Sequence, residues 1–353
     1  MHDGAANYLV AFILQLILQL LFTIVLMATM TIDERNAFDD TYAYRVIIII
    51  VNEISIGLTP LFYSKVLGQN YYKDMGFKKK LSLPKILMLI AIAFLTVVAF
   101  MPIAQFFFDL LVKTGYNTAK LTTLTVQTPA QLIIGIFLFA LMPAALEEIL
   151  YRGMIARAFK KKSFISAILL GGALFALMHA SPAQLIHQFF LGCVCCIAYF
   201  ATGSIYAPII VHFVNNLIAV VGSYILYLNP VNFTTLTFVL MFVIGLILLF
   251  VALFVFLKMC NKKVHIRMGF RNLEAVFIEC FMSDEEKALK EKKDAEIQAK
   301  IEATGMQEVG EVYVQTKEIM DADEKAKGNK ALLLAFVFAA AILVINTITG
   351  YLN

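Results

Sequence analysis

Long apolar runs alternate with short polar segments along the whole chain, and few polar residues interrupt the runs. Each run approaches the roughly 20 residues that an α-helix needs to cross a bilayer. The pattern predicts an all-α fold, a polytopic transmembrane helix bundle of eight to nine spans. The nine candidate spans lie at about 8–30, 43–64, 86–108, 130–151, 163–180, 183–201, 204–227, 233–257 and 331–350.

Composition supports the same fold class. The 353 residues are 61% hydrophobic and only 15% charged, whereas soluble globular chains average nearer 45–50% and about 25%. These values exclude an ordinary soluble enzyme, a disordered chain and a disulfide scaffold. Three of the five cysteines lie inside the sixth span, where a thiol behaves as a small hydrophobe. A net charge of +4 gives no sign of a nucleic-acid partner.

The basic residues predict the orientation in the membrane. Segments 65–85, 152–162 and 258–330 hold 25 of the 29 Lys and Arg residues, and alternation of nine spans places all three on one face. Positively charged loops are retained in the cytoplasm. We therefore expect a multi-pass protein of the cell membrane with its N-terminus and segment 259–330 in the cytoplasm and its C-terminus outside.

Three parts are expected along the chain: a transmembrane bundle over 1–258, a charged segment over 259–330 and a final membrane helix within 331–353. The charged segment mixes signs at helical spacing, as in Glu286 and Lys290. It is therefore expected to be a helical cytoplasmic insert, either a solvated helix or an arm that binds a protein partner.

Ionisable and amide side chains inside the spans are rare. Such side chains are costly in a bilayer and mark functional sites by default. They are Glu53, Glu147, Glu148, Arg152, His179, His187 and His212, joined by Asn215 and Asn216.

Glu147, Glu148 and Arg152 form the most informative run. Glu148 and Arg152 are four residues apart on a helix, in the orientation that favours an ion pair. Glu147 then points about 100° away and is available for other chemistry. Pro143 precedes them and predicts irregular helix geometry, which is tolerated at membrane depth beside a polar cavity. The alternative is a purely structural ion pair near the cytoplasmic end.

His179 lies in the following span. If the chain turns near residues 160–162, Glu147 and His179 are both roughly 20–27 Å from that turn and reach a similar depth. Phe175, one helical turn before His179, is expected to pack against its ring. The alternative is an ordinary buried histidine.

His212 and Asn216 share one face of the seventh span. A histidine and an amide can donate hydrogen bonds to a developing oxyanion, or can hydrogen-bond between helices. Asn215 faces elsewhere and suits the packing role. His187 has no partner at a telling spacing, and Glu53 is a weaker candidate for the cavity. Together, the residues on three helices predict one shared polar cavity with Glu147 as general base.

The three stretches that contain Glu147-Glu148-x-x-x-Arg152, Phe175-x-x-x-His179 and His212-x-x-x-Asn216 resemble the motifs of the CPBP intramembrane protease family. This family includes the CAAX prenyl endopeptidases and bacterial relatives linked to bacteriocin processing and immunity. The resemblance covers about 85–225.

The resemblance implies an intramembrane endopeptidase that acts on a membrane-associated or lipidated peptide. Glu147 would activate water with help from His179, while His212 and Asn216 would stabilise the oxyanion. Glu148 and Arg152 would be architectural. No cofactor is expected; the alternative is zinc held by Glu147, His179 and His212.

Two other functions compete with proteolysis. A non-enzymatic immunity or binding protein would use the same polar cavity without chemistry. A transporter would use Glu53, Glu147 and the histidines as a relay, but it needs polar groups along a path on both faces.

Overall fold

In the computed structural model, the described part of the chain comprises residues 2–39, 41–66, 75–117, 126–160, 164–260 and 332–351, and its regular elements are all helices. The predicted all-α fold is confirmed. Segment 259–330, predicted to be a helical insert, lies almost entirely outside the described residues.

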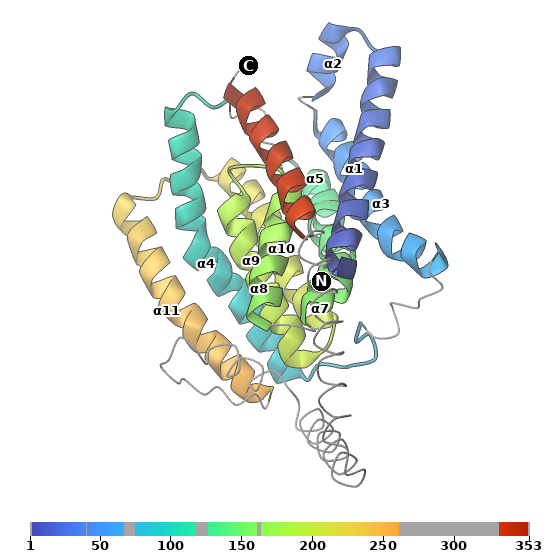
Figure 1. Ribbon diagram of the computed structural model, residues 1–353. Coiled ribbons are helices and arrows are strands. Elements are labelled where there is room, and N and C mark those ends of the chain that lie inside the picture. The colour runs from blue at the N-terminus through green and yellow to red at the C-terminus, as the bar shows by residue number, and fades with distance from the viewer. Residues whose placement is uncertain are drawn as a thin grey trace, which may run out of the picture.

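The helices form one bundle (Figure 1). In chain order they are α1 (His2–Thr29), α2 (Ile32–Asp39), α3 (Tyr42–Val66), α4 (Leu83–Lys113), α5 (Pro129–Gly135), η3 (Ile136–Leu141), α6 (Met142–Glu148), η4 (Ile149–Ala156), α7 (Arg157–Lys160), α8 (Phe164–Met178), α9 (Leu185–Thr202), α10 (Tyr206–Leu228), α11 (Thr235–Met259) and a C-terminal helix, Leu332–Tyr351. Helix α10 packs against α4, α6 and α9, while α11 packs on α4.

Eight helices in the described ranges are long and apolar enough to cross a membrane. The ninth candidate, predicted at 163–180, is the shorter helix α8 of 15 residues. At about 1.5 Å per residue it spans roughly 22 Å, less than the roughly 30 Å of bilayer hydrocarbon. The chain turns back at His179–Gln184 and descends through α9. Such irregular backbone at membrane depth is tolerated where it lines a cavity.

The fourth span changes its winding on both sides of the acidic pair. Thr128 begins it with a capping box, because its hydroxyl accepts from the Gln131 backbone and the Gln131 side chain accepts from the Thr128 backbone. Segments η3 and η4, which flank α6, are π-helical. Pro143 is the second residue of α6 and has no N–H to donate to the preceding turn. The helix is therefore irregular near Pro143, as predicted, and π-helical turns of this kind are frequent at functional sites.

Helices α8 and α9 approach each other closely through glycines. A Cβ on Gly192 would lie 2.8 Å from the Cα of Gly172, and a Cβ on Gly172 would lie 2.8 Å from the carbonyl oxygen of Phe189. Small residues at membrane helix contacts allow such backbone approach. The contact fixes His179, at the end of α8, relative to the buried face of α9.

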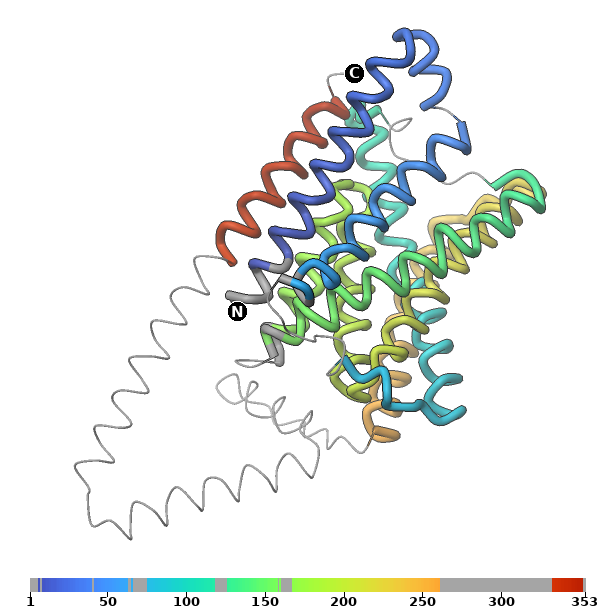
Figure 2. Tube along the Cα trace, turned by 90° about the vertical axis from the view of Figure 1, so that its right-hand side faces the viewer, coloured from blue at the N-terminus to red at the C-terminus, as the bar shows by residue number. Residues whose placement is uncertain are grey.

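The two ends of the bundle are distinct. At one end, α3 finishes with Lys65 in its last turn, and Ser204, just before α10, donates to the carbonyl of Lys79 at 2.7 Å. At the other end, the Tyr116 hydroxyl donates to the carbonyl of Asn346 at 3.4 Å. The C-terminal helix also runs beside α1, with Phe12 and Phe338 in edge contact (Figures 1 and 2). Lys65 and Lys79, both in the segment 65–85 that was predicted to be cytoplasmic, thus lie at the same end of the bundle.

Candidate active site

A cavity of about 500 Å³ lies within the bundle and brings four predicted site residues together: Glu147, His179, His212 and Asn216. Its walls come from α1, α3, η3, α6, the 178–184 turn, α9, α10 and the C-terminal helix. Its volume falls in the range of about 300–1,000 Å³ typical of ligand sites. The shared polar cavity predicted from three helices is present.

Glu147 lies in the cavity beside Glu53 of α3. The two carboxyl groups share a hydrogen bond. One of them must supply the proton of that bond, so the pair can carry one proton and one negative charge. The Oε2 atom of each is buried and forms no hydrogen bond to another described residue. Glu147 therefore offers a carboxylate oxygen to a water or a substrate.

Glu148 joins two helices through one oxygen atom. Its Oε1 accepts from Arg152 Nη1 at 2.7 Å and contacts His212 Nδ1 at 2.8 Å. The pairing with Arg152 is the predicted one, whereas the contact with His212 extends the role of Glu148 to the site itself. Because a carboxylate only accepts, Nδ1 of His212 carries the proton. The Nε2 atom of His212 is then an acceptor in the neutral ring and a donor in the protonated ring.

Arg152 is completely buried, and its guanidinium has partners on three sides. Besides Glu148, Nη2 donates to the carbonyl of Gly192 on α9 at 3.0 Å, and the guanidinium carbon lies 4.5 Å from the centre of the Phe175 ring. A buried arginine persists only when paired and hydrogen-bonded in this way. Through these contacts Arg152 holds η4 in place against α8 and α9.

Phe175 is in edge contact with both candidate histidines. Its ring centre lies 5.0 Å from that of His179 and 5.5 Å from that of His212. The backbone carbonyl of Phe175 also accepts from His179 Nδ1 at 2.9 Å. Because a carbonyl only accepts, this bond places the proton on Nδ1 and leaves Nε2 of His179 as a lone-pair acceptor. The expected packing of Phe175 on His179 is confirmed.

Asn216 is the last member of a polar chain that the sequence did not reveal. His187 Nε2 lies 2.9 Å from Asn215 Oδ1, and Asn215 Nδ2 donates to Asn216 Oδ1 at 3.1 Å. The amide oxygen of Asn216 is therefore engaged, which leaves its Nδ2 group as the donor available to the cavity. Asn215, expected to hydrogen-bond between helices, does so with His187 of α9, for which spacing gave no partner, and its amide also contacts Asn216.

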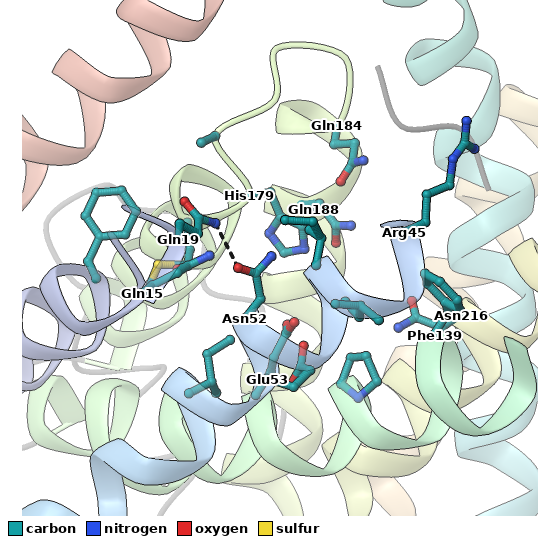
Figure 3. Close-up of a pocket in the computed structure, with 18 of the residues that line it drawn as sticks. Gln15, Gln19, Arg45, Asn52, Glu53, Phe139, His179, Gln184, Gln188 and Asn216 are labelled. Atoms are coloured by element: carbon teal, nitrogen blue, oxygen red, sulfur yellow. Dashed lines mark hydrogen bonds between the residues drawn. The ribbon is translucent and has the colours of Figure 1, made fainter. Parts of the chain in front are cut away.

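The cavity has a second polar wall outside the predicted residues. Figure 3 shows Gln15 and Gln19 of α1 and Asn52 of α3 close to His179 and Gln188. Gln19 Nε2 donates to Asn52 Oδ1 at 2.8 Å. Each of these positions is a polar residue within an apolar run, and that feature of the sequence could have identified it. The adjacent polar residues Asn52 and Glu53 were the clearest case.

The side chains do not fit a zinc site as they stand. Over the described ranges, no group of three or more His, Cys, Asp and Glu side chains is arranged to hold a metal ion. Glu147, His179 and His212 line the same cavity, and the hydrogen bonds of the two rings engage Nδ1 and leave Nε2 free.

The central part of the chain matches a known protein family. Residues 129–218 match the Rce1-like family model, Type II CAAX prenyl endopeptidase Rce1-like. The Rce1-like segment contains all three motif stretches and runs from the start of α5 into α10. This match confirms the family resemblance found in the motifs. No curated protein and no solved structure matches the chain.

The Rce1-like segment supplies only one side of the cavity. Glu53, Asn52 and the glutamines of α1 lie before residue 129, and Asn346 lies well after residue 218. Helices α1 and α3 and the C-terminal helix therefore build the other side of the cavity, outside the matched region.

Proposed function

We propose that the protein is an intramembrane endopeptidase that hydrolyses a peptide bond of a membrane-associated or lipidated substrate. The observation that carries the proposal is the convergence of Glu147, His179 and Asn216 in one cavity. The Rce1-like match supports peptidase activity in general, because that family is one of proteases.

Glu147 is the proposed general base. Its carboxylate takes a proton from a water molecule, and the water oxygen bonds to the carbonyl carbon of the scissile peptide. Nε2 of His179 accepts the second water hydrogen and fixes the direction of attack. Collapse of the tetrahedral intermediate breaks the C–N bond, and the proton on Glu147 passes to the leaving amine. Glu147 acts as the base in the state of the pair in which the proton of the shared hydrogen bond lies on Glu53 and Glu147 is the carboxylate.

Asn216 is the proposed donor to the oxyanion. Its Nδ2 group is the free end of the amide, because Asn215 occupies the oxygen. His212 adds a second donor from Nε2 when the ring is protonated, and its orientation is fixed by Glu148. Donors positioned in advance at a buried site stabilise developing negative charge most effectively, and removing one typically costs about 100- to 1,000-fold in rate.

His187 and Asn215 are proposed positioning residues. Replacing His187 with Ala would free the Asn215 amide to turn and would release Asn216. We expect His187→Ala to lower kcat at constant KM, whereas His187→Gln retains a donor and keeps most of kcat. A purely structural role would lower the amount of folded protein in both variants and leave the kcat of the folded fraction unchanged.

The mechanism is proposed to be metal-free. Chelation by EDTA or 1,10-phenanthroline should leave the rate of the purified protein unchanged, and metal analysis should find less than one zinc per chain in active protein. Loss of activity on chelation with full recovery on adding zinc would contradict this part of the proposal.

The proposed function is tested by comparing wild type with Glu147→Gln at matched abundance in the native host. Mass spectrometry of the membrane fraction should find peptide termini that depend on wild type. Gly222→Ala is the matched control, since an added Cβ there meets no atom within 4 Å, and it should behave as wild type. Identical termini in all three strains, with folded protein in each, would favour a binding role for the cavity.

A further inference from the structure

The direction in which the cavity opens follows from the burial of its lining residues. On α10, His212 is 2% exposed, Asn216 is half-buried and Ala219 is exposed. On α3, Glu53 is 1% exposed, while Tyr44 and Arg45 are half-buried. Two antiparallel helices thus agree that the cavity is closed near Glu53 and His212. It opens roughly 10–12 Å away, toward the first turn of α3 and the second half of α10.

The closed end faces the lysine-rich end of the bundle. Helix α3 runs from the open end of the cavity at Tyr44 down to Lys65. Helix α10 begins beside Lys79, to whose carbonyl Ser204 donates, and passes His212 before Ala219. Because lysine-rich loops stay in the cytoplasm, the open end lies on the extracytoplasmic side.

The wall of the cavity carries side-chain amides from several helices. Gln15, Gln19, Asn52, Gln184, Gln188 and Asn346 all line the cavity. Each amide presents both a donor and an acceptor, as does each unit of a peptide backbone. The Oε1 atoms of Gln15 and Gln188 are buried and form no hydrogen bond with other described residues. Such orphaned acceptors are rare in folded proteins and suit the N–H groups of a bound peptide.

The turn at His179–Gln184, which borders the open end of the cavity and is called the rim below, is hydrogen-bonded to the C-terminal helix. Asn346 Nδ2 donates to the carbonyl of Ala180 at 3.0 Å, and Ala180 has a positive φ of 47° that few residues adopt. The turn itself lies within the Rce1-like segment, whereas Asn346, which holds it, lies outside that segment.

From these observations we infer that the substrate is an extended, exported peptide segment that enters from the extracytoplasmic face. The inference rests on the proposed function and names the side and chemistry of its substrate. The amide wall pairs with the peptide main chain and guides the scissile bond down to Glu147. A lipidated C-terminus in the cytoplasm would meet the closed end, so such a chain is excluded as the substrate.

The first test measures access without any substrate. Ala219→Cys and Gln184→Cys place thiols at the open end (the rim thiols), and Lys258→Cys places one at the opposite end of the bundle. Intact cells are treated with a membrane-impermeant maleimide, and the wild-type background is subtracted. We expect both rim thiols to be labelled in intact cells and Lys258→Cys to be labelled only in inverted vesicles. Labelling of the rim from inverted vesicles alone, or from neither side, would overturn the inference.

The second test locates the cleaved peptides. Termini that depend on Glu147 should lie in segments exported across the membrane or exposed on its outer face, and termini confined to cytoplasmic segments would overturn the inference. The protease function and the side from which the substrate enters can be refuted independently of each other. If Glu147→Gln changes no termini while the rim thiols react from outside, the protease function fails and the orientation of the cavity stands.

Discussion

Breaking the buried pair between Glu148 and Arg152 should have a large and specific effect on stability. Both side chains are fully buried, and Arg152 Nη1 lies 2.7 Å from Glu148 Oε1. Arg152→Met leaves the Glu148 carboxylate without its cation, although His212 remains beside it. Removing one partner of a buried pair typically costs about 3–5 kcal/mol of unfolding free energy. Glu148→Gln leaves the Arg152 charge unpaired and should cost a similar amount.

The double variant Glu148→Gln/Arg152→Met should be much milder than the sum of the single changes. Neither charge remains, and the amide oxygen introduced by Glu148→Gln can still accept from His212 Nδ1. Two contacts of Arg152 are lost: the hydrogen bond to Gly192 at about 1 kcal/mol and the contact with the Phe175 face at about 1 kcal/mol. We therefore expect the double variant to cost about 2 kcal/mol, with a coupling energy of about 4 kcal/mol or more between the two sites.

The assay is unfolding of purified protein in mixed micelles on titration with SDS. The chain has no tryptophan, so circular dichroism of the helices is the readout. Glu286→Gln, in the charged segment outside the described residues, controls for loss of a carboxylate elsewhere. Additive effects of the two single substitutions, or single variants as stable as wild type, would refute the buried pair.

Four further outcomes follow from the same contacts. Gly192→Ala should reduce the yield of folded protein strongly because its Cβ would meet the Gly172 backbone, whereas Gly222→Ala should not; equal yields by size-exclusion chromatography would contradict the α8–α9 contact. Phe175→Ala should lower unfolding free energy by about 3–5 kcal/mol, measured by the same titration. Glu53→Gln should lower kcat less than Glu147→Gln does, and an equal loss would place Glu53 in the base role. Asn216→Ala should lower kcat about 100-fold or more at little change in KM, as steady-state kinetics on a cleaved peptide would show.

The spans were predictable because hydrocarbon thickness sets the length of an apolar run. The similar depth of Glu147 and His179 followed from counting helical residues on either side of one turn. The ion pair of Glu148 and Arg152 lies within a single helix, so its spacing of four residues was sufficient. These inferences required only the rise and period of a helix.

Contacts between helices were not predictable in the same way. A helix that is apolar all round gives no periodicity from which to derive its rotation. The contact of His212 with Glu148, which joins residues 64 apart, therefore could not be read from spacing. The pairing of Glu53 with Glu147 and of His187 with Asn215 depends on the same rotations. The π-helical turns beside Glu147 also shift side chains in ways that a regular helix does not anticipate.

Apart from Glu53, the part of the cavity built by α1, α3 and the C-terminal helix was missed for another reason. Its glutamines and asparagines are single polar residues in apolar runs, and a lone amide in a span is as consistent with helix packing as with a site. Only the arrangement of the helices shows that Gln15, Gln188 and Asn346 face one volume.

The central claim is that this chain itself hydrolyses peptide bonds with Glu147 as the base. The most direct measurement is to reconstitute purified wild type and Glu147→Gln in lipid bilayers with peptides extracted from the native membrane, in water enriched in ¹⁸O. Hydrolysis adds one water oxygen to each new carboxyl terminus. The account predicts new C-termini carrying one ¹⁸O with wild type and none with Glu147→Gln. Labelled termini formed equally by both proteins, or by neither while both are folded, would contradict it.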